Sequence, residues 1–502
     1  MLYSIVIARS NRLITLQLSE QLCVEEFIMK IIGRDKERRI LSRCEQSDRP
    51  EFIAVYGRRR VGKTFLIVEH FANKFTFSVT GISGGSTAEQ LNEFRSSLMR
   101  HYKTDFPVLK NWHEAFFVLE TQLDRDLKTG KKIIFIDELP WFDTHRSGFL
   151  KALEHFWNAF ALRHPDIMLI VCGSAASWIT NNLIDSYGGL HNRVTETISI
   201  EPFQLHECES FYSSRGIAFT RQQIAEAYMI LGGVPYYMDS MDKMFGLNQN
   251  IDLLLFDKNA RLSGEYSRLY HSLFRFAENH ICVVEALAEN NCGLTRQELL
   301  SATGISNGGG LSKVISELES CGFISSCFDI KRKRNGEYYK LIDFFSLFHY
   351  KYLKKRKNTD PHFWTNYLSE PAHRVWCGYA FERLCISHIQ QIKQRLGISG
   401  VITEVYAFRS SQQKGGAQID LLIDRRDESI NLCECKYSNK AFTLTEDYIA
   451  ELERKKEIFL QETKTKKSIH MTMITANGLT HNAYRNEIQA EITLDDLFAP
   501  VL

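Results

Sequence analysis

The feature that most constrains this chain is a glycine-rich loop set between an apolar run and a helical run. Residues 57–64 read Gly-Arg-Arg-Arg-Val-Gly-Lys-Thr and fit the pattern G-x-x-x-x-G-K-[ST]. The apolar segment 51–56 precedes the loop and a helical run over 65–73 follows it, as this motif requires. Such a loop turns backbone N–H groups toward phosphate oxygens at a helix N-terminus, where the helix dipole adds positive potential. The sequence therefore predicts a nucleotide-phosphate site on an α/β fold.

The residues of this loop have separate expected roles. Lys63 should reach the β- and γ-phosphates of ATP, and the Thr64 hydroxyl should bind Mg²⁺. The alternative is an ordinary glycine-containing turn without a ligand. The residues expected to contact the nucleotide are Gly57, Arg58, Arg59, Arg60, Val61, Gly62, Lys63 and Thr64.

An acidic pair ends a second apolar run. Asp137 and Glu138 follow Lys-Ile-Ile-Phe-Ile, and ligands bind at the carboxyl ends of strands in parallel sheets. We expect Asp137 to hold Mg²⁺ through water, and Glu138 to orient or deprotonate the attacking water. The alternative is an acidic strand end with no role.

Apolar segments alternate with helical stretches from residue 29 to about 205. Continuous apolar strands separated by helices indicate a parallel sheet that is covered on both faces. One candidate strand lies between the two motifs in sequence, a pattern typical of ATP-hydrolysing P-loop proteins rather than simple kinases or GTPases. The predicted strands are 51–56, 75–80, 132–137, 167–173 and 194–201.

Residues 29–345 resemble the AAA+-related ATPases of the archaeal ATPase family, within or near the STAND group. The resemblance implies that Gly33 and Arg34 lie near the adenine and that Ser174 occupies the position that senses the γ-phosphate. It also implies that the stretch ending at Pro235 begins part of a helical lid. The motifs that carry it are Gly33-Arg34 with Glu37, the loop 57–64, Asp137-Glu138, Cys172-Gly-Ser174-Ala-Ala-Ser177-Trp178 and Gly232-Gly-Val-Pro235.

Three of these assignments have plainer alternatives. Arg193, just before the fifth predicted strand, is a candidate for an arginine that stabilises transition-state charge, in cis or across a subunit contact. The alternative, which we favour, is a structural or solvated arginine. Ser174 could be a plain turn residue, and the stretch to Pro235 an ordinary helix-ending turn.

The middle of the chain reads as helical over 206–264, and the order of elements in 265–345 resembles a winged helix. Thr295-Arg-Gln-Glu298 is a capping box that opens a helix, and Asn335-Gly336 joins two strand-like segments. The basic run 331–334 at the hairpin tip could touch DNA phosphates. A solvated tip, or a packing role for this region, is the alternative.

The carboxyl-terminal region places acids and a lysine on two predicted strands, 416–424 and 431–436. A hairpin-like return would bring Asp420 close to Glu434, and period-2 alternation puts Lys436 on the face of Glu434. Two carboxylates and a lysine can bind Mg²⁺ or Mn²⁺ and activate a water. Asp424, by contrast, is expected to be a solvated strand end.

The pattern D-x13-E-x-K resembles the PD-(D/E)xK nuclease fold over 372–498. By that resemblance Glu382, on the first helix, joins Asp420 and Glu434 as a metal ligand, and Asp420, Glu434 and Lys436 are catalytic. The alternative is a degenerate domain that binds DNA or regulates.

The whole chain is predicted as an α/β multidomain protein: a P-loop parallel sheet with a helical lid, a winged helix-turn-helix and a restriction-endonuclease-like domain. Its net charge of +2 excludes a strongly basic packaging protein but leaves a local nucleic-acid contact open. No apolar run could cross a membrane and no signal peptide is evident, so a cytoplasmic protein is expected. The predicted parts are an extension over 1–28, the ATPase core 29–205, the lid 206–264, the winged helix 265–345, a basic linker 346–371 and the nuclease-like domain 372–502.

Three functions fit these motifs. The first is an ATP-dependent DNA-processing protein whose nucleotide state gates the nuclease-like domain, with ATP and DNA as partners and Mg²⁺ as cofactor. The second is a STAND-like signalling switch in which ATP controls homo-oligomerisation or a partner protein. The third is a winged-helix transcription factor that uses ATP as a switch.

Overall fold

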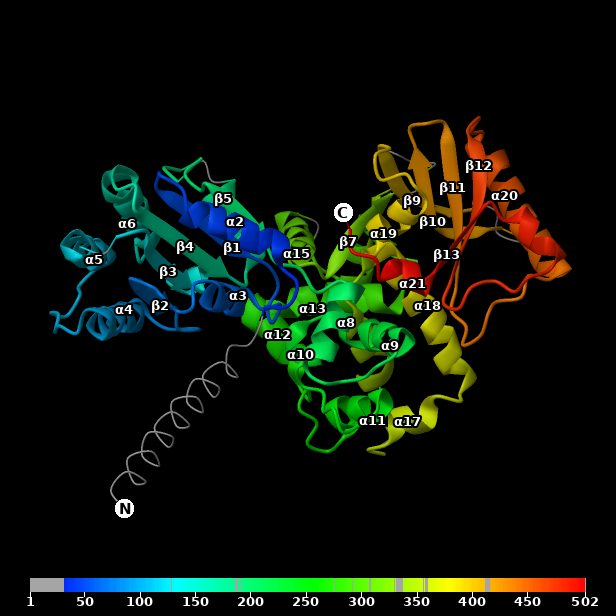
Figure 1. Cartoon of the computed structure of the whole chain (residues 1–502), viewed down its shortest axis with the longest axis horizontal. Coiled ribbons are helices and arrows are strands. Elements are labelled where there is room, and N and C mark those ends of the chain that lie inside the picture. Colours follow the sequence, from blue (N-terminus) through cyan, green and yellow to red (C-terminus); the bar gives the residue numbers. More distant parts are fainter. Residues whose placement is uncertain are drawn as a thin grey trace, which may run out of the picture. The chain divides into compact units, whose positions relative to one another are not determined.

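The chain forms two compact units, labelled by element in Figure 1. The first unit holds the residues up to Tyr56, Gly62–Gly173 and Asn182–Ile198, and the second holds Gly57–Val61, Ser174–Asn181 and the residues from Ser199 on. The extension 1–28 and the hairpin tip 331–336 lie outside the described residues. The computed structural model describes residues 31–127, 129–185, 188–190, 192–274, 276–290, 292–306, 308–328, 330, 337–354, 356, 360–410 and 416–501, with only the backbone of Asp420.

A five-stranded sheet forms the centre of the first unit. Its order is β2-β3-β4-β1-β5, and β2, β3, β4 and β1 run parallel to one another. The predicted parallel sheet is therefore confirmed, with β4 lying between β1 and β3. The strands are β1 (Glu51–Tyr56), β2 (Phe77–Thr80), β3 (Lys132–Asp137), β4 (Ile167–Gly173) and β5 (Glu196–Ser199).

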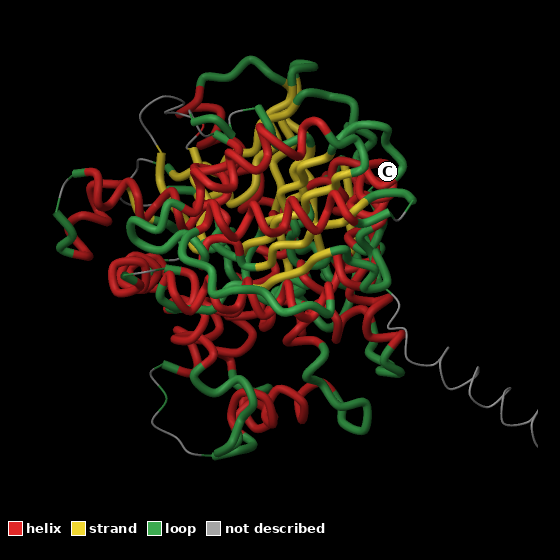
Figure 2. Tube along the Cα trace, turned by 90° about the vertical axis from the view of Figure 1, so that its left-hand side faces the viewer, coloured by secondary structure: helices red, strands yellow, loops and turns green. Residues whose placement is uncertain are grey.

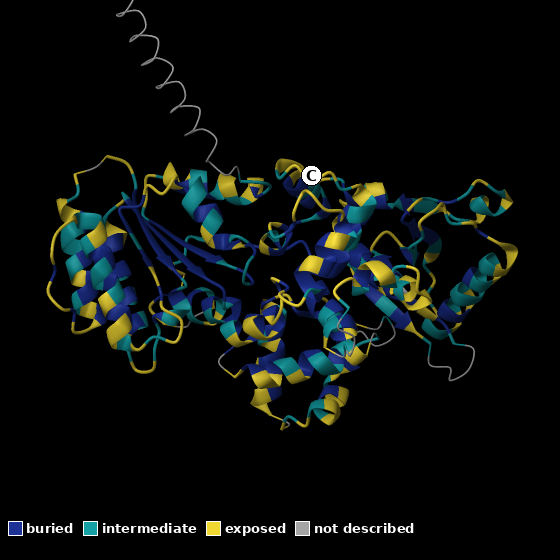
Figure 3. Ribbon diagram, turned by 90° about the horizontal axis from the view of Figure 1, so that it is seen from below, coloured by how far each residue is buried: buried dark blue, intermediate teal, exposed yellow. Residues whose placement is uncertain are grey.

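The strands of this sheet are apolar because they are buried on both faces. Every residue of β3 and β4 is buried, and Figure 3 shows these strands in the buried colour. Aromatic side chains such as Trp112 and Phe116 pack among the surrounding helices. Those helices are α2 (Asp35–Glu45), α3 (Lys63–His70), α4 (Thr87–Tyr102), α5 (Trp112–Arg125) and α6 (Phe149–His155).

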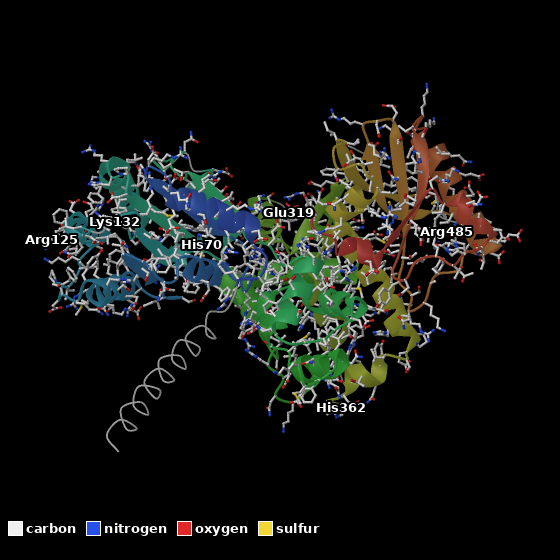
Figure 4. All side chains as sticks on the ribbon, viewed as in Figure 1. His70, Arg125, Lys132, Glu319, His362 and Arg485 are labelled. Carbon is white, nitrogen blue, oxygen red and sulfur yellow. The ribbon has the colours of Figure 1, made fainter. Side chains whose placement is uncertain are left out.

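A buried lysine fixes the start of β3, at the end of the strand opposite Asp137. The ammonium of Lys132, labelled in Figure 4, donates to the carbonyl of Leu123 at 2.8 Å and lies 3.0 Å from the Asp166 carboxylate. Burying a charged group is costly unless it is paired and hydrogen-bonded, and both conditions are met here.

The second unit begins with helices. The described residues of 206–264 contain no strand, which agrees with the sequence prediction. Gly232 ends one helix in a left-handed conformation, and Pro235 opens the next at its first position, where the missing N–H costs nothing. The helices are α7 (Ala176–Ile179), α8 (Leu205–Ser214), α9 (Arg221–Leu231), α10 (Pro235–Met238), α11 (Leu247–Ile251) and α12 (Glu265–Leu273).

Three helices and a small sheet follow. The capping box at Thr295 is present: its side chain accepts from the Glu298 N–H, and the Glu298 carboxylate accepts from the Thr295 N–H. Strands β7 and β8 are antiparallel, in a sheet of order β6-β8-β7. The elements are α13 (Ala277–Glu289), β6 (Leu294–Thr295), α14 (Arg296–Thr303), α15 (Gly309–Ser320), β7 (Ile324–Phe328) and β8 (Glu337–Leu341).

The last region contains a second five-stranded sheet, of order β13-β12-β11-β10-β9. Strands β9, β10 and β11 are antiparallel, whereas β11, β12 and β13 are parallel. Figure 2 distinguishes these strands, in yellow, from the helices, in red. The strands are β9 (Thr403–Arg409), β10 (Gln418–Arg425), β11 (Ser429–Lys436), β12 (Ser468–Thr475) and β13 (Ala490–Thr493).

Helices precede and interrupt this sheet. They are α16 (Phe344–Phe348), α17 (Phe363–Tyr367), α18 (Pro371–Ser387), α19 (Ile389–Arg395), α20 (Glu446–Thr463) and α21 (Leu494–Leu497). In the part of the chain that the structure describes, no helix combines the length and the apolarity that a membrane crossing needs.

Candidate functional site

The two glycines that bound the loop 57–62 are required for different reasons. A Cβ on Gly57 would lie 2.2 Å from the carbonyl oxygen of Ile200, so only a glycine fits this close backbone approach. Gly62 has open space around it but a φ of 92°, in the left-handed region that favours glycine. Together they allow the loop to turn sharply from β1 into α3.

Residues that follow the loop meet the acidic end of β3. The hydroxyl of Thr64 donates to the Asp137 carboxylate at 2.9 Å, and Lys63 is buried at the first position of α3. Burial and the neighbouring charge of Glu138 raise the pKa of Asp137, while the hydrogen bond from Thr64 lowers it. Hydroxyl and carboxylate oxygens are ligands that suit Mg²⁺, so the residues present fit that ion.

Cys172 belongs to the same cluster, which the sequence motifs did not indicate. It is fully buried on β4, and its side chain donates to Asp137. Burial and the charge of Asp137 raise the pKa of this thiol, which keeps it protonated as a donor. Its signal lies in the pairing of β3 with β4, which ends with Ile136 opposite Val171. The residues that follow, Asp137 and Cys172, are therefore at the same end of two neighbouring parallel strands.

Glu138 adopts a left-handed backbone conformation, with a φ of 49°, immediately after β3. Its N–H donates to the Asp137 carboxylate at 3.0 Å, and its side chain is half-buried. Non-glycine residues with positive φ are uncommon and cluster at functional sites, where the surrounding structure holds them in place.

The side chains of two loop arginines turn to carboxylates of the same chain. Arg58 Nη1 lies 2.5 Å from Asp343 Oδ1, and both residues are buried. Arg60 Nε lies 2.9 Å from the buried Glu265 Oε1, while Arg59 is half-buried. The guanidinium groups of Arg58 and Arg60 therefore have partners within this chain, and contact of these residues with the nucleotide stays a prediction.

The remaining residues predicted for the nucleotide site occupy turns. Gly33 and Arg34 are both left-handed and lead into α2, and Arg34 is buried. Ser174 is buried directly after β4. Pro235 opens α10, and Arg193 is exposed just before β5, with its N–H bonded to the Leu190 carbonyl.

The carboxyl-terminal candidates converge on β11. Lys436 Nζ lies 3.1 Å from Glu434 Oε1, so the predicted sharing of one face by these two residues is confirmed. A second lysine, Lys455 of α20, lies 3.0 and 2.9 Å from the two oxygens of the same carboxylate. Glu434 is only 9% exposed and thus has two ammonium partners, of which the sequence predicted one.

Glu382 and the cysteines lie by the other side of β11. The hydrogen bond with Cys385, burial and the charge of Glu382 all raise the pKa of the Cys435 thiol. Cys433 is buried as well. Among the described residues, which exclude the side chain of Asp420, no three His, Cys, Asp or Glu side chains form a group that could hold a metal ion.

Asp424 differs from its expectation. It was predicted to be a solvated strand end, but it is buried, and its carboxylate accepts from Lys467 Nζ at 2.7 Å. The partner comes from the segment just before β12, 43 residues further on, so the local sequence gave no sign of this ion pair.

Part of the chain is similar to known proteins. Residues 32–241 match the family described as an ATPase domain predominantly from Archaea. The chain is 23% identical over 325 residues to an uncharacterised protein of Methanocaldococcus jannaschii, which covers 64% of this chain and 68% of that protein.

Two solved structures also resemble it. A Walker-type ATPase of Pyrococcus abyssi has 16% identity and a TM-score of 0.44, covering 64% of this chain and 96% of that chain. The ORC2 protein of Aeropyrum pernix has 12% identity and a TM-score of 0.42, covering 64% and 93%. The family match includes the loop 57–64 and the Asp137-Glu138 pair, so this part of the chain is similar to an ATPase domain that occurs predominantly in Archaea.

Proposed function

We propose that this protein hydrolyses ATP and couples its nucleotide state to the binding or cleavage of DNA by its carboxyl-terminal region. The observation that carries the DNA half is the cluster of Glu434 and Lys436 on β11, beside the antiparallel strand that contains Asp420. In this proposal the winged helix spans 265–345, after the lid 206–264, and the nuclease-like domain spans 372–502, after the linker 346–371.

In the ATP site, the N–H groups of the loop and the ammonium of Lys63 would bind the phosphates. Thr64 and Asp137 would hold Mg²⁺, which offsets negative charge on the phosphates. Glu138 would orient the attacking water and accept its proton. Ser174 is proposed to sense the γ-phosphate, and Arg193 to stabilise developing charge. Gly33 and Arg34 would lie near the adenine, and Pro235 would belong to the start of the helical lid.

The proposed DNA site is supported by the register of the β10–β11 hairpin. Leu422 is opposite Leu432, and Leu421 is opposite Cys433. The observed pairing ends at Leu421 and Cys433, next to Asp420 and Glu434, and β10 is irregular against β9 between Ile419 and Leu422. Continuing the β10–β11 register by one residue would set Asp420 opposite Glu434. Residues directly opposite in an antiparallel pair are close neighbours on one face, which suits a shared metal ion. Asp420 and Glu434 would hold Mg²⁺, and Lys436 would contact the scissile phosphate. Glu382 lies by Cys435 on the other side of β11 and is not assigned to this ion.

A cleavage assay tests this proposal. Linear and circular DNA are incubated with the full chain and Mg²⁺, with and without ATP, and strand breaks are measured on gels. We expect cleavage that depends on Mg²⁺ and on ATP and is lost in Asp420→Asn and Glu434→Gln. Asp427→Asn, an exposed carboxylate in the β10–β11 turn that pairs with Arg425, is the matched control and should cleave like the wild type. Equal cleavage by Asp420→Asn would refute the assigned site.

The second candidate is a STAND-like switch whose terminal region docks without catalysis. The observation that favours it is the second lysine on Glu434, because the two positive charges of Lys436 and Lys455 already exceed the single negative charge of this carboxylate. This candidate predicts no strand breaks and a change of molecular mass between ADP and ATP in light scattering. An unchanged mass together with DNA cleavage would reject it.

A further inference from the structure

Two carboxylates beyond the residues matched by the ATPase family pair with arginines of the phosphate loop. Arg60 lies between two groups: its Nε pairs with Glu265 Oε1 at 2.9 Å, and its guanidinium carbon is 3.8 Å from the centroid of the Tyr236 ring. Glu265 is the first residue of α12 and is 1% exposed. The hydroxyl of Tyr237 donates to the same Glu265 oxygen at 3.2 Å, so this carboxylate joins the loop to α10.

Arg58 is held in the same way by a second carboxylate. Its Nη1 lies 2.5 Å from Asp343 Oδ1, and its guanidinium carbon is 5.1 Å from the centroid of the Phe323 ring. The other oxygen of Asp343 accepts from the N–H and the hydroxyl of Ser346, at 2.9 and 2.6 Å, where it caps α16. Ser346 therefore holds the Asp343 carboxylate in place independently of its pairing with Arg58.

Three of the four charged side chains in these pairs, Arg58, Asp343 and Glu265, are buried, and Arg60 is 17% exposed. The second oxygen of Glu265 also lies 3.7 Å from Arg268 Nε. Removing one partner of a buried pair leaves the other charge without compensation, which is strongly unfavourable. Arg60 also has a φ of 72°, a conformation that a non-glycine residue keeps only where its surroundings hold it. Glu265 and the Tyr236 ring supply that restraint.

We propose that Glu265 and Asp343 are positioning residues for the ATP site. They hold Arg60 and Arg58 and so keep residues 57–61 in the shape that presents the loop N–H groups to the phosphates. Both carboxylates lie beyond residue 241, where the match to the ATPase family ends. ATP affinity in this chain then depends on residues outside its ATPase domain. This inference rests on nucleotide binding by the loop 57–64.

The alternative, in which Arg60 contacts the nucleotide directly, makes a different prediction. The dissociation constant of ADP is measured by calorimetry on the full-length wild type, Glu265→Gln, Arg60→Gln and the double variant. Loss of a hydrogen bond to a charged group changes an equilibrium constant about tenfold or more. Each single variant should therefore bind ADP about tenfold more weakly than the wild type. The double variant should bind ADP no more weakly than either single variant. If Arg60→Gln weakens binding and Glu265→Gln does not, the positioning role is overturned.

Two further variants keep the test decisive. Asp239→Asn removes a partly exposed ion pair with Arg215 and should leave the ADP affinity unchanged. If Glu265→Gln does not fold, Tyr236→Leu, at a ring 39% exposed, decides the question: unchanged affinity would overturn the proposal. The exchange Arg60→Glu with Glu265→Arg should restore part of the affinity lost in the single variants.

Failure of this inference is distinct from failure of the proposed ATPase. A wild type that does not bind ADP, or a Lys63→Ala variant that binds it as the wild type does, would reject both. A wild type that binds ADP and a folded Glu265→Gln that binds it equally well would reject only the role of Glu265.

Discussion

The surroundings of Asp137 shift its pKa in opposite directions. Its burial and the charge of Glu138 favour the protonated form, whereas the hydrogen bonds from Thr64 and Cys172 favour the carboxylate. A cation bound beside it would add a further influence toward the ionised form. Binding of Mg²⁺ at this position should therefore weaken as the pH falls, because protons compete for the same oxygens.

Substitution of the neighbouring residue, Glu138, should affect ATP hydrolysis but not ATP binding. Glu138→Gln keeps the shape of the side chain but removes its capacity to accept a proton, so we expect ATP to bind normally and turnover to fall roughly 100-fold or more. Lys63→Ala should lose nucleotide binding itself. Phosphate release and nucleotide affinity, measured on both variants, check this. Continued turnover by Glu138→Gln would refute its assigned role.

The two glycine environments predict opposite effects of the same substitution. Gly57→Ala places a methyl group 2.2 Å from the Ile200 carbonyl oxygen, so the loop must shift, and we expect ATP affinity to fall at least tenfold. Gly378→Ala, inside α18 with no atom within 4 Å, should stabilise the chain by about 0.5–1 kcal/mol. ATP titration and thermal unfolding of both variants provide the comparison, and equal ATP affinity in Gly57→Ala would contradict the steric argument.

Single residues were predictable where a motif fixes their spacing. Thr64 and Asp137 were found because the loop and the strand end each have a recognisable sequence, and they do meet. Lys455 was missed because it lies on another element, 21 residues from Glu434, and only the fold brings the two together. The same holds for Asp343, 285 residues from Arg58.

At the level of elements, burial decided what could be predicted. The fully buried strands β3 and β4 are continuous apolar runs and were found with their observed bounds. Strands β9 and β13 were missed, since each is an edge strand of its sheet and mixes polar with apolar residues. An edge strand has fewer neighbours to contact, so its sequence carries less of the apolar signal.

The cap of α14 permits a direct test at this scale. Thr295 satisfies an N–H group in the first turn that would otherwise lack a partner in the helix, so Thr295→Ala should lower the free energy of unfolding by about 1 kcal/mol. Ser301→Ala, on an exposed position of the same helix, should change it by less than about 0.5 kcal/mol. Urea unfolding followed by circular dichroism measures both. Equal losses in the two variants would show that the cap contributes nothing.

Over the whole molecule, buried histidines make stability depend on pH. Burial lowers the pKa of His388 to about 4, and its Nε2 accepts from the Leu205 N–H at 3.2 Å, which requires the neutral ring. His349, stacked on the Tyr266 ring, also has its pKa lowered to about 4, chiefly by burial. The unfolded chain takes up these protons first, near pH 6.5. The stability that the neutral rings provide is therefore complete above that pH and is lost as the pH falls toward 4.

The lowered pKa of His388 should reduce the free energy of unfolding by at most about 3 kcal/mol between pH 7 and pH 4. Thermal unfolding between pH 7.5 and 4.5 should show a shallower pH dependence for His388→Gln than for the wild type. His362→Gln, at an exposed histidine, is the control. An unchanged pH dependence in His388→Gln would contradict the assignment.

The division of the chain into two units has a consequence for dissecting this protein. The polypeptide passes from one unit to the other at residues 56/57, 61/62, 173/174, 181/182 and 198/199. Neither unit is a contiguous stretch, so a fragment that stops near residue 205 carries the segments Gly57–Val61 and Ser174–Asn181 away from the residues with which they cluster. An experiment that divides or transplants parts of this protein should therefore keep both units in one polypeptide.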